Sequence, residues 1–526
     1  MRTLLRRTAT VLAGLFVLFV LIAPSDLEEF TPEAFLRVPL EGLIGVMVLV
    51  LLPDRFRKPA AVLGGVALGL FTVVKIMDIG FDVVLYRPFD LVLDWPLLVP
   101  AIDFVDVTFG RFASVLAVGL TVALVAGIVW LASISVLRLS SSAAGRRPVA
   151  IRAVALTAVA CVSLAVPGIP VYSDAAATAL VDHARRVKVG LHDQEVFAAE
   201  ASVDAFRGRT DLLSSLQGKD VVFTFVESYG KSALDMPDVR AKLADGDSRL
   251  KAAGYSARSA YLTSPTAGGG SWMAQATLLS GLWIDNQQRY RNLVASDRLT
   301  LPRAFRESSW RSVGVVPGIT QAWPEGDFFH YDEIYDAGRL GYKGPRFGYA
   351  TTPDQFTLES FQRNVRSKVH GPVMAAIPMV SSHAPWSPTP DSVDWEKLGD
   401  GSIYSTMPAS NDPPESIFGR DPAAVRADYA HSISYSLESV VSYLEEYGDE
   451  NLVMVFLGDH QPAQMVTGEG ASRDVPITIV AKDPAVLREV GSWKWDDGLK
   501  PGGTAPVSRM SDFRDQFLSA FSPPQA

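Results

Sequence analysis

The chain has 526 residues, of which 20% are charged and 48% are hydrophobic, and its formal net charge is −9. This length is enough for more than one domain. The acidic balance gives no electrostatic footprint for nucleic acid. The single cysteine, Cys161, excludes a disulfide within the chain and a cysteine-based zinc site. Any metal must therefore be bound by carboxylate, hydroxyl or imidazole groups.

The first third of the chain is much more apolar than the rest. A helix that crosses a bilayer needs about 20 apolar residues. A signal peptide would explain only one such run, but the sequence has five: Thr8–Ala23, Val38–Leu52, Ala60–Phe81, Phe112–Leu137 and Ile151–Val171. The third and fourth runs have the full length, and the others reach it with a little flanking sequence. We therefore predict an α-helical membrane domain of five helices over residues 1–171.

Charged residues between the apolar runs predict the orientation, because cytoplasmic loops are enriched in Lys and Arg. One side has the basic residues Arg2, Arg6, Arg7, Arg55, Arg57, Lys58, Arg138, Arg146, Arg147 and Arg152. The other side is mostly acidic, with Glu28, Glu29, Glu33, Asp82, Asp90, Asp94, Asp103 and Asp106. We predict a multi-pass plasma-membrane protein with a cytoplasmic N-terminus. Everything after about Tyr172 is then extracytoplasmic.

Ionisable residues inside apolar runs are candidates for function. Lys75 and Asp78 lie three positions apart and share one helix face, so pairing with each other is the simplest interpretation. Glu41, near the start of the second run, is a further candidate. The roles of these residues stay open at this point.

The remainder of the chain has the pattern of an α/β domain. We predict a helical linker over residues 172–218. Residues 219–526 are expected to form a globular extracytoplasmic catalytic domain. Short apolar runs alternate with helical segments, which favours a mostly parallel central sheet covered by helices. The runs expected to be strands are Val221–Val226, Tyr255–Tyr261, Ser312–Val316, Val373–Val380, Leu452–Leu457 and Pro476–Val480.

Residues suited to bind a metal follow three of these runs. Glu227 comes after the first, His383 after the fourth, and Asp459 with His460 after the fifth. Ligand sites in α/β proteins lie at the carboxyl edge of the sheet, and an adjacent Asp and His can offer an oxygen and a nitrogen to one cation. We therefore expect one site at this edge. Taken singly, each residue is also explained as an ordinary polar residue of a surface loop.

A glycine-rich segment, Ser264–Trp272, ends in Gly270 and Ser271 and opens a helical run. Taken alone, it is explained by a tight turn with Ser271 as the helix N-cap. A serine nucleophile must be activated by a base or a metal. Together with Glu227, Asp459 and His460, Ser271 would complete a mononuclear metal site in which the cation lowers the pKa of the hydroxyl.

These motifs resemble the sulfatase-like branch of the alkaline phosphatase superfamily, and more closely its lipoteichoic acid synthase group of phosphoglycerol transferases. The matching segments are Val226-Glu227-Ser228, Gly270-Ser271-Trp272, Ser382-His383-Ala384 and Gly458-Asp459-His460. Five membrane spans before an outer catalytic domain is also the layout of that group. The resemblance covers nearly the whole chain.

The resemblance implies transfer of a phosphoglycerol-type head group from a membrane phospholipid to a cell-envelope glycan or lipid. Ser271 would be the nucleophile that becomes covalently modified. Glu227, Ser271, Asp459 and His460 would hold one divalent metal ion, with Mn²⁺ expected and Zn²⁺ or Mg²⁺ left open. His383 and Trp323 would contact the substrate.

Two departures from the family pattern affect the choice of substrate. Ser271 is not followed by the x-Pro-x-Arg motif of sulfatases that mature to formylglycine, which disfavours sulfate esters. Near Trp323, Glu325 stands where the synthases have Arg, and their His is missing; Asp327 and His330 lie close in sequence. A phosphoethanolamine transferase, a phosphoester hydrolase and a catalytically inactive surface-binding protein remain as alternatives.

Overall fold

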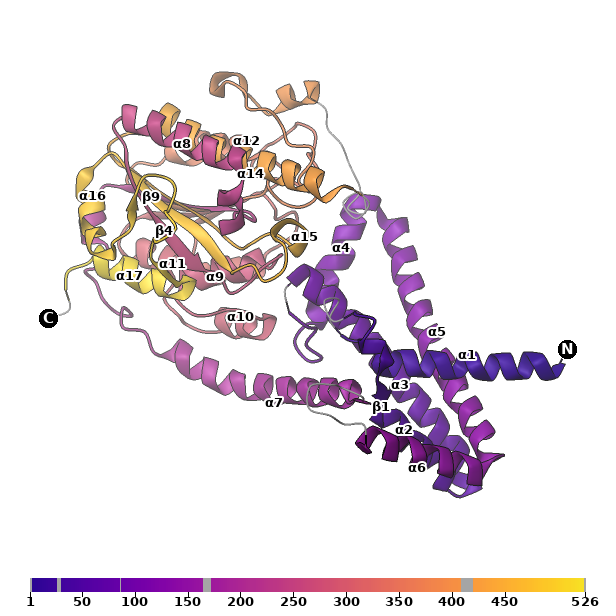
Figure 1. Cartoon of the computed structure of the whole chain (residues 1–526). Helices are drawn as coiled ribbons and strands as arrows, with labels where there is room; N and C mark the ends of the chain where they lie inside the picture. The colour runs from indigo at the N-terminus through magenta and orange to yellow at the C-terminus, as the bar shows by residue number, and fades with distance from the viewer. Residues whose placement is uncertain (1, 26–29, 86, 164–171, 408–419, 525–526) are drawn as a thin grey trace. The chain divides into compact units, whose positions relative to one another are not determined.

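The computed structural model describes residues 2–25, 30–85, 87–163, 172–407 and 420–524 (Figure 1). The chain divides into two compact units, Met1–Val83 with Arg87–His192, and Val84–Tyr86 with Asp193–Ala526. The predicted boundaries at residues 171 and 218 stay predictions. Helix α7 (Ala175–Ser202) extends beyond the last residue of the first unit.

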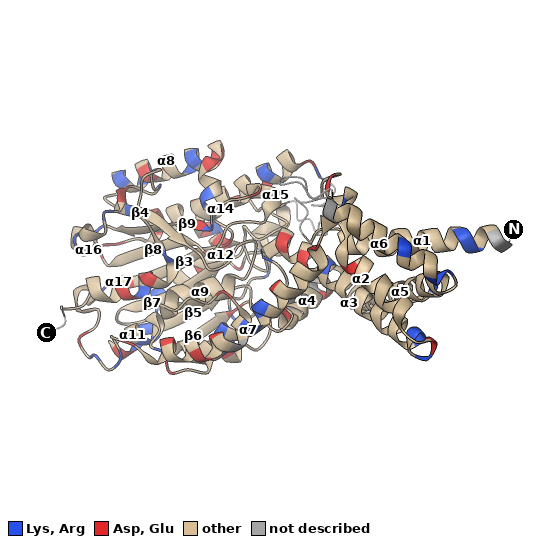
Figure 2. Ribbon diagram, turned by 60° about the horizontal axis from the view of Figure 1, so that its bottom comes forward, with Lys and Arg blue, Asp and Glu red and all other residues tan. Residues whose placement is uncertain are grey.

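The first unit is mostly helical, with one short parallel pair of strands, β1 (Val38–Pro39) and β2 (Tyr172–Ser173). Three of its helices contain segments long and apolar enough to cross a membrane: Leu4–Ile22, Asp54–Leu85 and Arg111–Ala144. Charged residues are sparse along α3 and α5 and dense over the second unit (Figure 2). Besides α7, the named helices of this region are α1 (Arg2–Ile22), α2 (Leu40–Leu51), α3 (Asp54–Leu85), α4 (Leu98–Phe109), α5 (Arg111–Ala144) and α6 (Arg147–Ser163).

Two of the five predicted spans are not confirmed. Helix α2 has only 12 residues, or roughly 18 Å at 1.5 Å per residue, whereas the hydrocarbon core is about 30 Å thick. Helix α6 has 17 residues, and the rest of the fifth predicted span, residues 164–171, lies outside the described residues. A helical region with three candidate spans is therefore established, and the count of five stays a prediction.

Small residues let α3 and α5 pack closely. A Cβ atom at Gly65 would lie 2.4 Å from the Ser133 Cα atom, and one at Gly69 would lie 2.6 Å from the Val129 Cα atom. Close backbone approach at small residues is a common way for helices to associate in a bilayer. The glycines four residues apart on α3 therefore form its contact face for α5.

The prediction that Lys75 pairs with Asp78 is wrong, because the contacts that the structure describes give both residues other partners. The Lys75 ammonium donates instead to the carbonyl oxygens of Val20 and Ala23. The Asp78 carboxylate hydrogen-bonds the His183 ring at 3.0 Å and accepts the Phe89 N–H at 3.1 Å. Both residues are buried, so each has found partners on other segments of the chain.

A nine-stranded sheet forms the centre of the second unit, with the order β10-β4-β9-β8-β3-β7-β5-β6 and β11 beside β4. Its strands are β3 (Asp220–Val226), β4 (Ser256–Thr263), β5 (Arg311–Val316), β6 (Glu333–Asp336), β7 (Val373–Met379), β8 (Leu452–Gly458), β9 (Asp474–Ala481), β10 (Asp496–Asp497) and β11 (Val507–Arg509). The expected parallel arrangement holds for β8, β3, β7, β5 and β6, and β11 is also parallel to β4. Strand β9 runs antiparallel to both β8 and β4, so the sheet is mixed.

Helices cover both faces of this sheet (Figure 1). Along β3, Phe223 and Phe225 belong to one buried cluster, and Val222 and Val226 to the other. This alternation follows from the two-residue period of a strand, and a strand covered on both faces is apolar throughout. The first cluster includes residues of α9 (Ser271–Ser280), α11 (Leu301–Glu307) and α17 (Phe513–Ala520), and the second includes residues of α8 (Pro237–Ala252), α12 (Asp354–Phe361) and α14 (Pro422–Tyr447).

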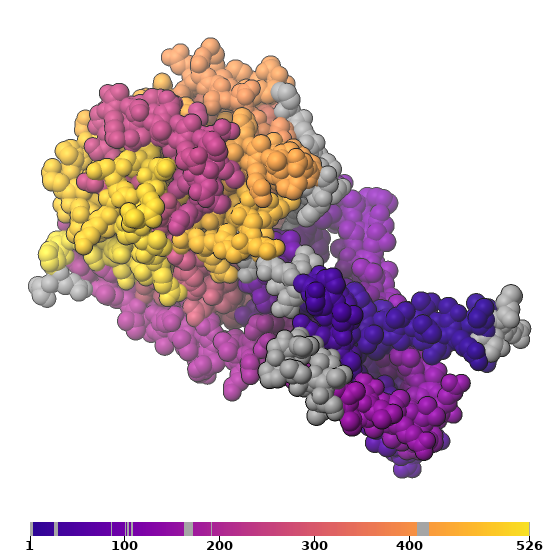
Figure 3. Space-filling model, in the orientation of Figure 1, coloured from indigo at the N-terminus to yellow at the C-terminus, as the bar shows by residue number. Residues whose placement is uncertain are grey.

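On the face of this unit that Figure 3 shows, residues of α8 lie beside the C-terminal segment. That segment completes the sheet edge, because β10 and β11 both pair with β4. The edge of the sheet near β4 is therefore covered by late parts of the chain.

Candidate active site

Two parallel neighbouring strands bring the predicted metal ligands together. Val226, the last residue of β3, is paired with Gly458, the last residue of β8. The residues that follow, Glu227 and Asp459, therefore leave the sheet side by side at its carboxyl edge. Ligand atoms of Glu227, Asp459 and His460 all lie within 4.8 Å of one another, and the three residues are buried.

Glycine is needed at the end of β8 because the backbone passes very close to another segment. A Cβ atom at Gly458 would lie 1.8 Å from the carbonyl oxygen of Tyr229. No side chain fits at that distance. Glycine at position 458 therefore lets the backbone at the end of β8 pass close to the turn that follows β3, which brings Asp459 next to that turn. In that turn Ser228 has a φ of 57° and donates its N–H to the Asp459 Oδ1 atom at 2.8 Å.

Ser271 begins helix α9 directly after three glycines. Gly268, Gly269 and Gly270 have φ values of 71°, 159° and 83°, in the region that glycine adopts most easily. The Ser271 hydroxyl donates to the Glu227 Oε2 atom at 2.8 Å and lies 3.2 Å from the His460 Nε2 atom. The glycine-rich turn thus places the hydroxyl against the cluster of ligands.

The donor set fits a divalent cation. The His460 Nδ1 atom lies 2.8 Å from the Gln461 carbonyl oxygen, which fixes the N–H on Nδ1 and leaves Nε2 facing the cluster. Asp459 uses Oδ1 for two backbone N–H groups, which leaves Oδ2 as a ligand atom. Among the described residues, no Lys or Arg forms an ion pair with either carboxylate. Two carboxylates, a hydroxyl and an imidazole suit Mn²⁺, Zn²⁺ or Mg²⁺.

Burial and mutual charge set the protonation of this cluster. Burial raises the pKa of the Asp459 carboxyl to about 7, and the adjacent Glu227 charge adds to this effect. Burial alone would lower the pKa of His460, but the charges of Asp459 and Glu227 outweigh it and raise that pKa to about 9. For Glu227, the effect of burial is outweighed by the charge and hydrogen bond of His460, so its pKa falls below the usual range.

These pKa values predict that metal affinity rises with pH, because a cation must displace protons from its ligands. Below about pH 7 both Asp459 and His460 carry a proton, and between about 7 and 9 only His460 does. The apparent Kd for a divalent ion should therefore fall roughly tenfold per pH unit between 7 and 9, and more steeply below 7. Calorimetric titration of metal-free protein would measure this. An affinity that does not change between pH 6 and 8 would contradict the assignment, and the exposed Asp238→Asn variant on α8 serves as the control.

His383 reaches the same edge of the sheet from the strand on the other side of β3. Met379 at the end of β7 is paired with Val226, and the turn after it carries His383. The His383 ring lies close enough for its charge to lower the pKa of Glu227. It is held by a contact of 2.7 Å between its Nδ1 atom and the Ala384 carbonyl oxygen, and by stacking on Tyr349 with ring centroids 4.1 Å apart.

No described contact joins Trp323 to Ser271, His383 or the candidate metal ligands. The Trp323 ring packs beside Phe329, with ring centroids 5.9 Å apart, and it borders the buried cluster on the α9 side of the sheet. Trp272, next to Ser271, donates its indole N–H to Gln287 at 3.1 Å. The predicted role of Trp323 in substrate binding stays a prediction.

Sequence reasoning missed Asp354, which positions the loop carrying His383. This fully buried carboxylate accepts the N–H groups of Val380 and Ser381 at 2.8 and 2.9 Å and the Ser436 hydroxyl at 2.6 Å. Burial raises its pKa, and these hydrogen bonds oppose the rise. In the sequence, Asp354 stands after a proline at the start of a helix, where Asp is common, so nothing distinguished it.

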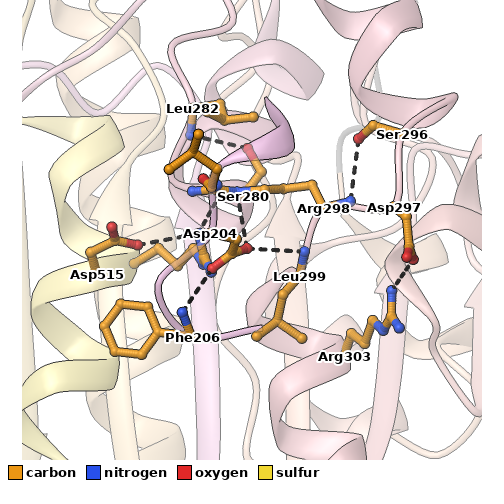
Figure 4. A network of polar contacts seen from close by, with 12 residues as sticks. Asp204, Phe206, Ser280, Leu282, Ser296, Asp297, Arg298, Leu299, Arg303 and Asp515 are labelled. Carbon is orange, nitrogen blue, oxygen red and sulfur yellow. Dashed lines mark hydrogen bonds and ion pairs between the residues drawn. The ribbon is translucent and has the colours of Figure 1, made fainter. Parts of the chain in front are cut away.

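The far end of α9 is anchored by a buried ionic network (Figure 4). The Ser280 carbonyl oxygen accepts from Arg298 at 3.0 Å and from Arg514 at 3.2 Å. Asp204 pairs with both guanidinium groups, at 3.4 Å and 2.5 Å. Positive charge at a helix C-terminus is favourable. The helix that begins at Ser271 is therefore fixed at its other end to the segment that follows α7.

Comparison with known families supports the resemblance for this domain. The family model described as Sulfatase matches residues 219–474, which include every candidate ligand from Glu227 to His460. The matched residues resemble the sulfatase family and make up slightly less than half of the chain. The resemblance of the sequence motifs to the sulfatase-like branch of the alkaline phosphatase superfamily is thereby confirmed. No curated protein matches the chain by sequence.

Several solved structures are similar to this chain. The lipoteichoic acid synthase LtaP from Listeria monocytogenes is 12% identical with a TM-score of 0.37, over 63% of this chain and 80% of that one. The phosphoglycerol transferase GacH from Streptococcus pyogenes is 14% identical with a TM-score of 0.38, and the match covers 63% of this chain and 80% of that one. The lipooligosaccharide phosphoethanolamine transferase EptA from Neisseria meningitidis is 11% identical with a TM-score of 0.48, and the match covers 97% of this chain and 95% of that one. These identities do not separate phosphoglycerol from phosphoethanolamine transfer.

Proposed function

We propose that this protein transfers a phosphoglycerol-type head group from a membrane phospholipid to a cell-envelope glycan or lipid, through a covalent intermediate on Ser271. The observation that carries the proposal is the position of the Ser271 hydroxyl, 2.8 Å from Glu227 and 3.2 Å from His460 at the start of a helix. A hydroxyl placed against metal ligands and facing free backbone N–H groups suits attack on a phosphoryl group.

Glu227, Ser271, Asp459 and His460 would hold one divalent ion, and the family resemblance favours Mn²⁺. Such an ion lowers the pKa of a serine hydroxyl and withdraws charge from phosphoryl oxygens. The absence of x-Pro-x-Arg after Ser271 argues against a formylglycine-dependent sulfatase. Phosphoryl transfer is therefore favoured over hydrolysis of sulfate esters.

The proposed reaction has two balanced steps. Ser271 Oγ loses its proton to solvent and attacks phosphorus, and the bond between phosphorus and the diacylglycerol oxygen breaks. His383 gives that oxygen a proton. In the second step His383 removes the proton of the acceptor hydroxyl, the acceptor oxygen attacks the phospho-serine, and Ser271 Oγ leaves and takes up a proton from solvent. Trp323 would contact the head group.

The membrane helices fit a lipid donor. A catalytic domain tethered to the bilayer meets its lipid substrate at high effective concentration. We keep the prediction of five spans with an extracytoplasmic catalytic domain, which would place the site on the same side as envelope acceptors. Glycosidase-accessible tags or cysteine labelling at residue 219 and beyond would test this orientation directly.

Release of diacylglycerol tests the proposed donor. The full-length protein would be placed in vesicles of phosphatidylglycerol, phosphatidylethanolamine or phosphatidylcholine, each with Mn²⁺ or a chelator. We expect metal-dependent diacylglycerol from phosphatidylglycerol. Diacylglycerol from phosphatidylethanolamine alone would move the assignment to phosphoethanolamine transfer, and its absence with every lipid would overturn lipid-dependent transfer.

A further inference from the structure

The first unit contains a cavity of about 300 Å³ that the proposed chemistry does not use. Helices α1, α2, α3 and α5 line it, and three of these contain candidate membrane spans. Its lining is aliphatic or glycine apart from Glu41 and Ser140. Gly45, Val48 and Gly64 are exposed, so the cavity opens to the surroundings of the helices, which in a bilayer are lipid chains.

Glu41 has one carboxylate oxygen with a partner and one without. The Oε1 atom accepts the Ala177 N–H at 2.8 Å, in the first turn of α7. The Oε2 atom is buried and has no hydrogen-bond partner among the described residues. An unpaired charged oxygen is costly in a low-dielectric setting.

The cation that interacts electrostatically with Glu41 is already committed elsewhere. The Lys75 ammonium donates to the carbonyl oxygens of Val20 at 3.1 Å and Ala23 at 2.5 Å. No ion pair joins Lys75 to Glu41 among the described contacts. The cavity therefore has an apolar wall, and the one acidic residue that lines it has a buried carboxylate oxygen without a partner among the described residues.

We propose that this cavity binds an aminophospholipid, with an acyl chain against the aliphatic wall and the head-group ammonium donating to Glu41 Oε2. A primary ammonium supplies both the positive charge and the N–H that this oxygen lacks. A choline head group has no N–H, and a phosphatidylglycerol head group offers hydroxyl donors but no positive charge beside its phosphate. The site is independent of the proposed function, because no residue of the catalytic cluster lines it.

The glycines of the lining offer a clean way to fill the cavity. A Cβ atom at Gly45 or Gly64 would meet nothing within 4 Å. A leucine at Gly64 therefore extends into open space rather than into backbone. Gly119 on α5 is equally free of neighbours and does not line the cavity, so Gly119→Leu is the matched control.

Competitive lipid retention tests the proposal. Full-length protein carrying Ser271→Ala, so that no lipid is consumed, would be mixed with equimolar phosphatidylethanolamine, phosphatidylglycerol and phosphatidylcholine of identical chains. Native mass spectrometry would count the lipids retained. We expect phosphatidylethanolamine to exceed each competitor by roughly tenfold, as for a charge-assisted hydrogen bond.

The variants separate head-group from chain recognition. Glu41→Gln keeps an acceptor for Ala177 and should abolish the head-group preference, while Gly64→Leu should reduce retention of all three lipids. Gly119→Leu and Asp54→Asn, an exposed carboxylate paired with Arg57, should behave as the parent protein. Equal retention of the three lipids, a preference for phosphatidylglycerol, or a preference that survives Glu41→Gln would each overturn the proposal.

Discussion

Replacing Ser271 with alanine is expected to reduce diacylglycerol release by at least roughly 10³-fold, because removing a covalent nucleophile costs on that order or more. A second hydroxyl, that of Ser228, also donates to Glu227, to Oε1 at 3.1 Å, but it lies in the turn after β3 and not at the start of α9. Asp459 and His460 offer ligands to a metal, and Glu227 is held by its contacts to His460. The variant should keep its fold and should still bind one divalent ion, with weaker affinity.

A matched control distinguishes this effect from loss of any serine hydroxyl. Ser248 on α8 is exposed and donates only to the Ala244 carbonyl of its own helix. Ser248→Ala should leave turnover unchanged. Turnover of Ser271→Ala at the parent rate would remove Ser271 from the mechanism and with it the covalent intermediate.

Replacing Asp204 with asparagine is expected to destabilise the second unit by about 3–5 kcal/mol, the usual cost of leaving a buried charge without its partner. Asparagine keeps the shape, but its single amide oxygen can accept only one of the two N–H groups that Asp204 binds, that of Phe206 on Oδ1 or that of Leu299 on Oδ2. It removes the negative charge between Arg298 and Arg514, whose side chains are only 4% and 0% exposed. Thermal unfolding should show a Tm lower by roughly 10 °C.

Asp297→Asn is the control for Asp204, and Figure 4 shows both carboxylates. Asp297 pairs with Arg303 and Arg207, but its side chain is 55% exposed. Exposed ion pairs contribute little to stability, so this variant should unfold close to the parent temperature. Equal Tm values for the Asp204 and Asp297 variants would show that the buried network does not anchor α9.

The position of the candidate ligands could be anticipated from sequence because it depends on local pattern. Apolar runs of strand length end at Glu227 and at Asp459, and a parallel pairing of those runs places both residues at one edge. The glycines before Ser271 similarly predict a tight turn into a helix. The roles assigned to these residues remain predictions that the experiments above address.

Other features depend on contacts between distant segments and could not be read from local pattern. The antiparallel direction of β9 is one, since its apolar run looks like that of any buried strand. Asp354 is another, because its function depends on the loop after β7 and on Ser436 of α14. The pairing of Asp78 with His183, 105 positions away, replaced the local partner Lys75 for the same reason.

The most direct test of the account is mass spectrometry of the peptide that contains Ser271, after incubating full-length protein with divalent metal and phosphatidylglycerol. We expect a glycerol-phosphate adduct on Ser271 that disappears when an acceptor is added. An unmodified Ser271 in a folded, metal-loaded sample that nevertheless releases diacylglycerol would contradict the covalent mechanism.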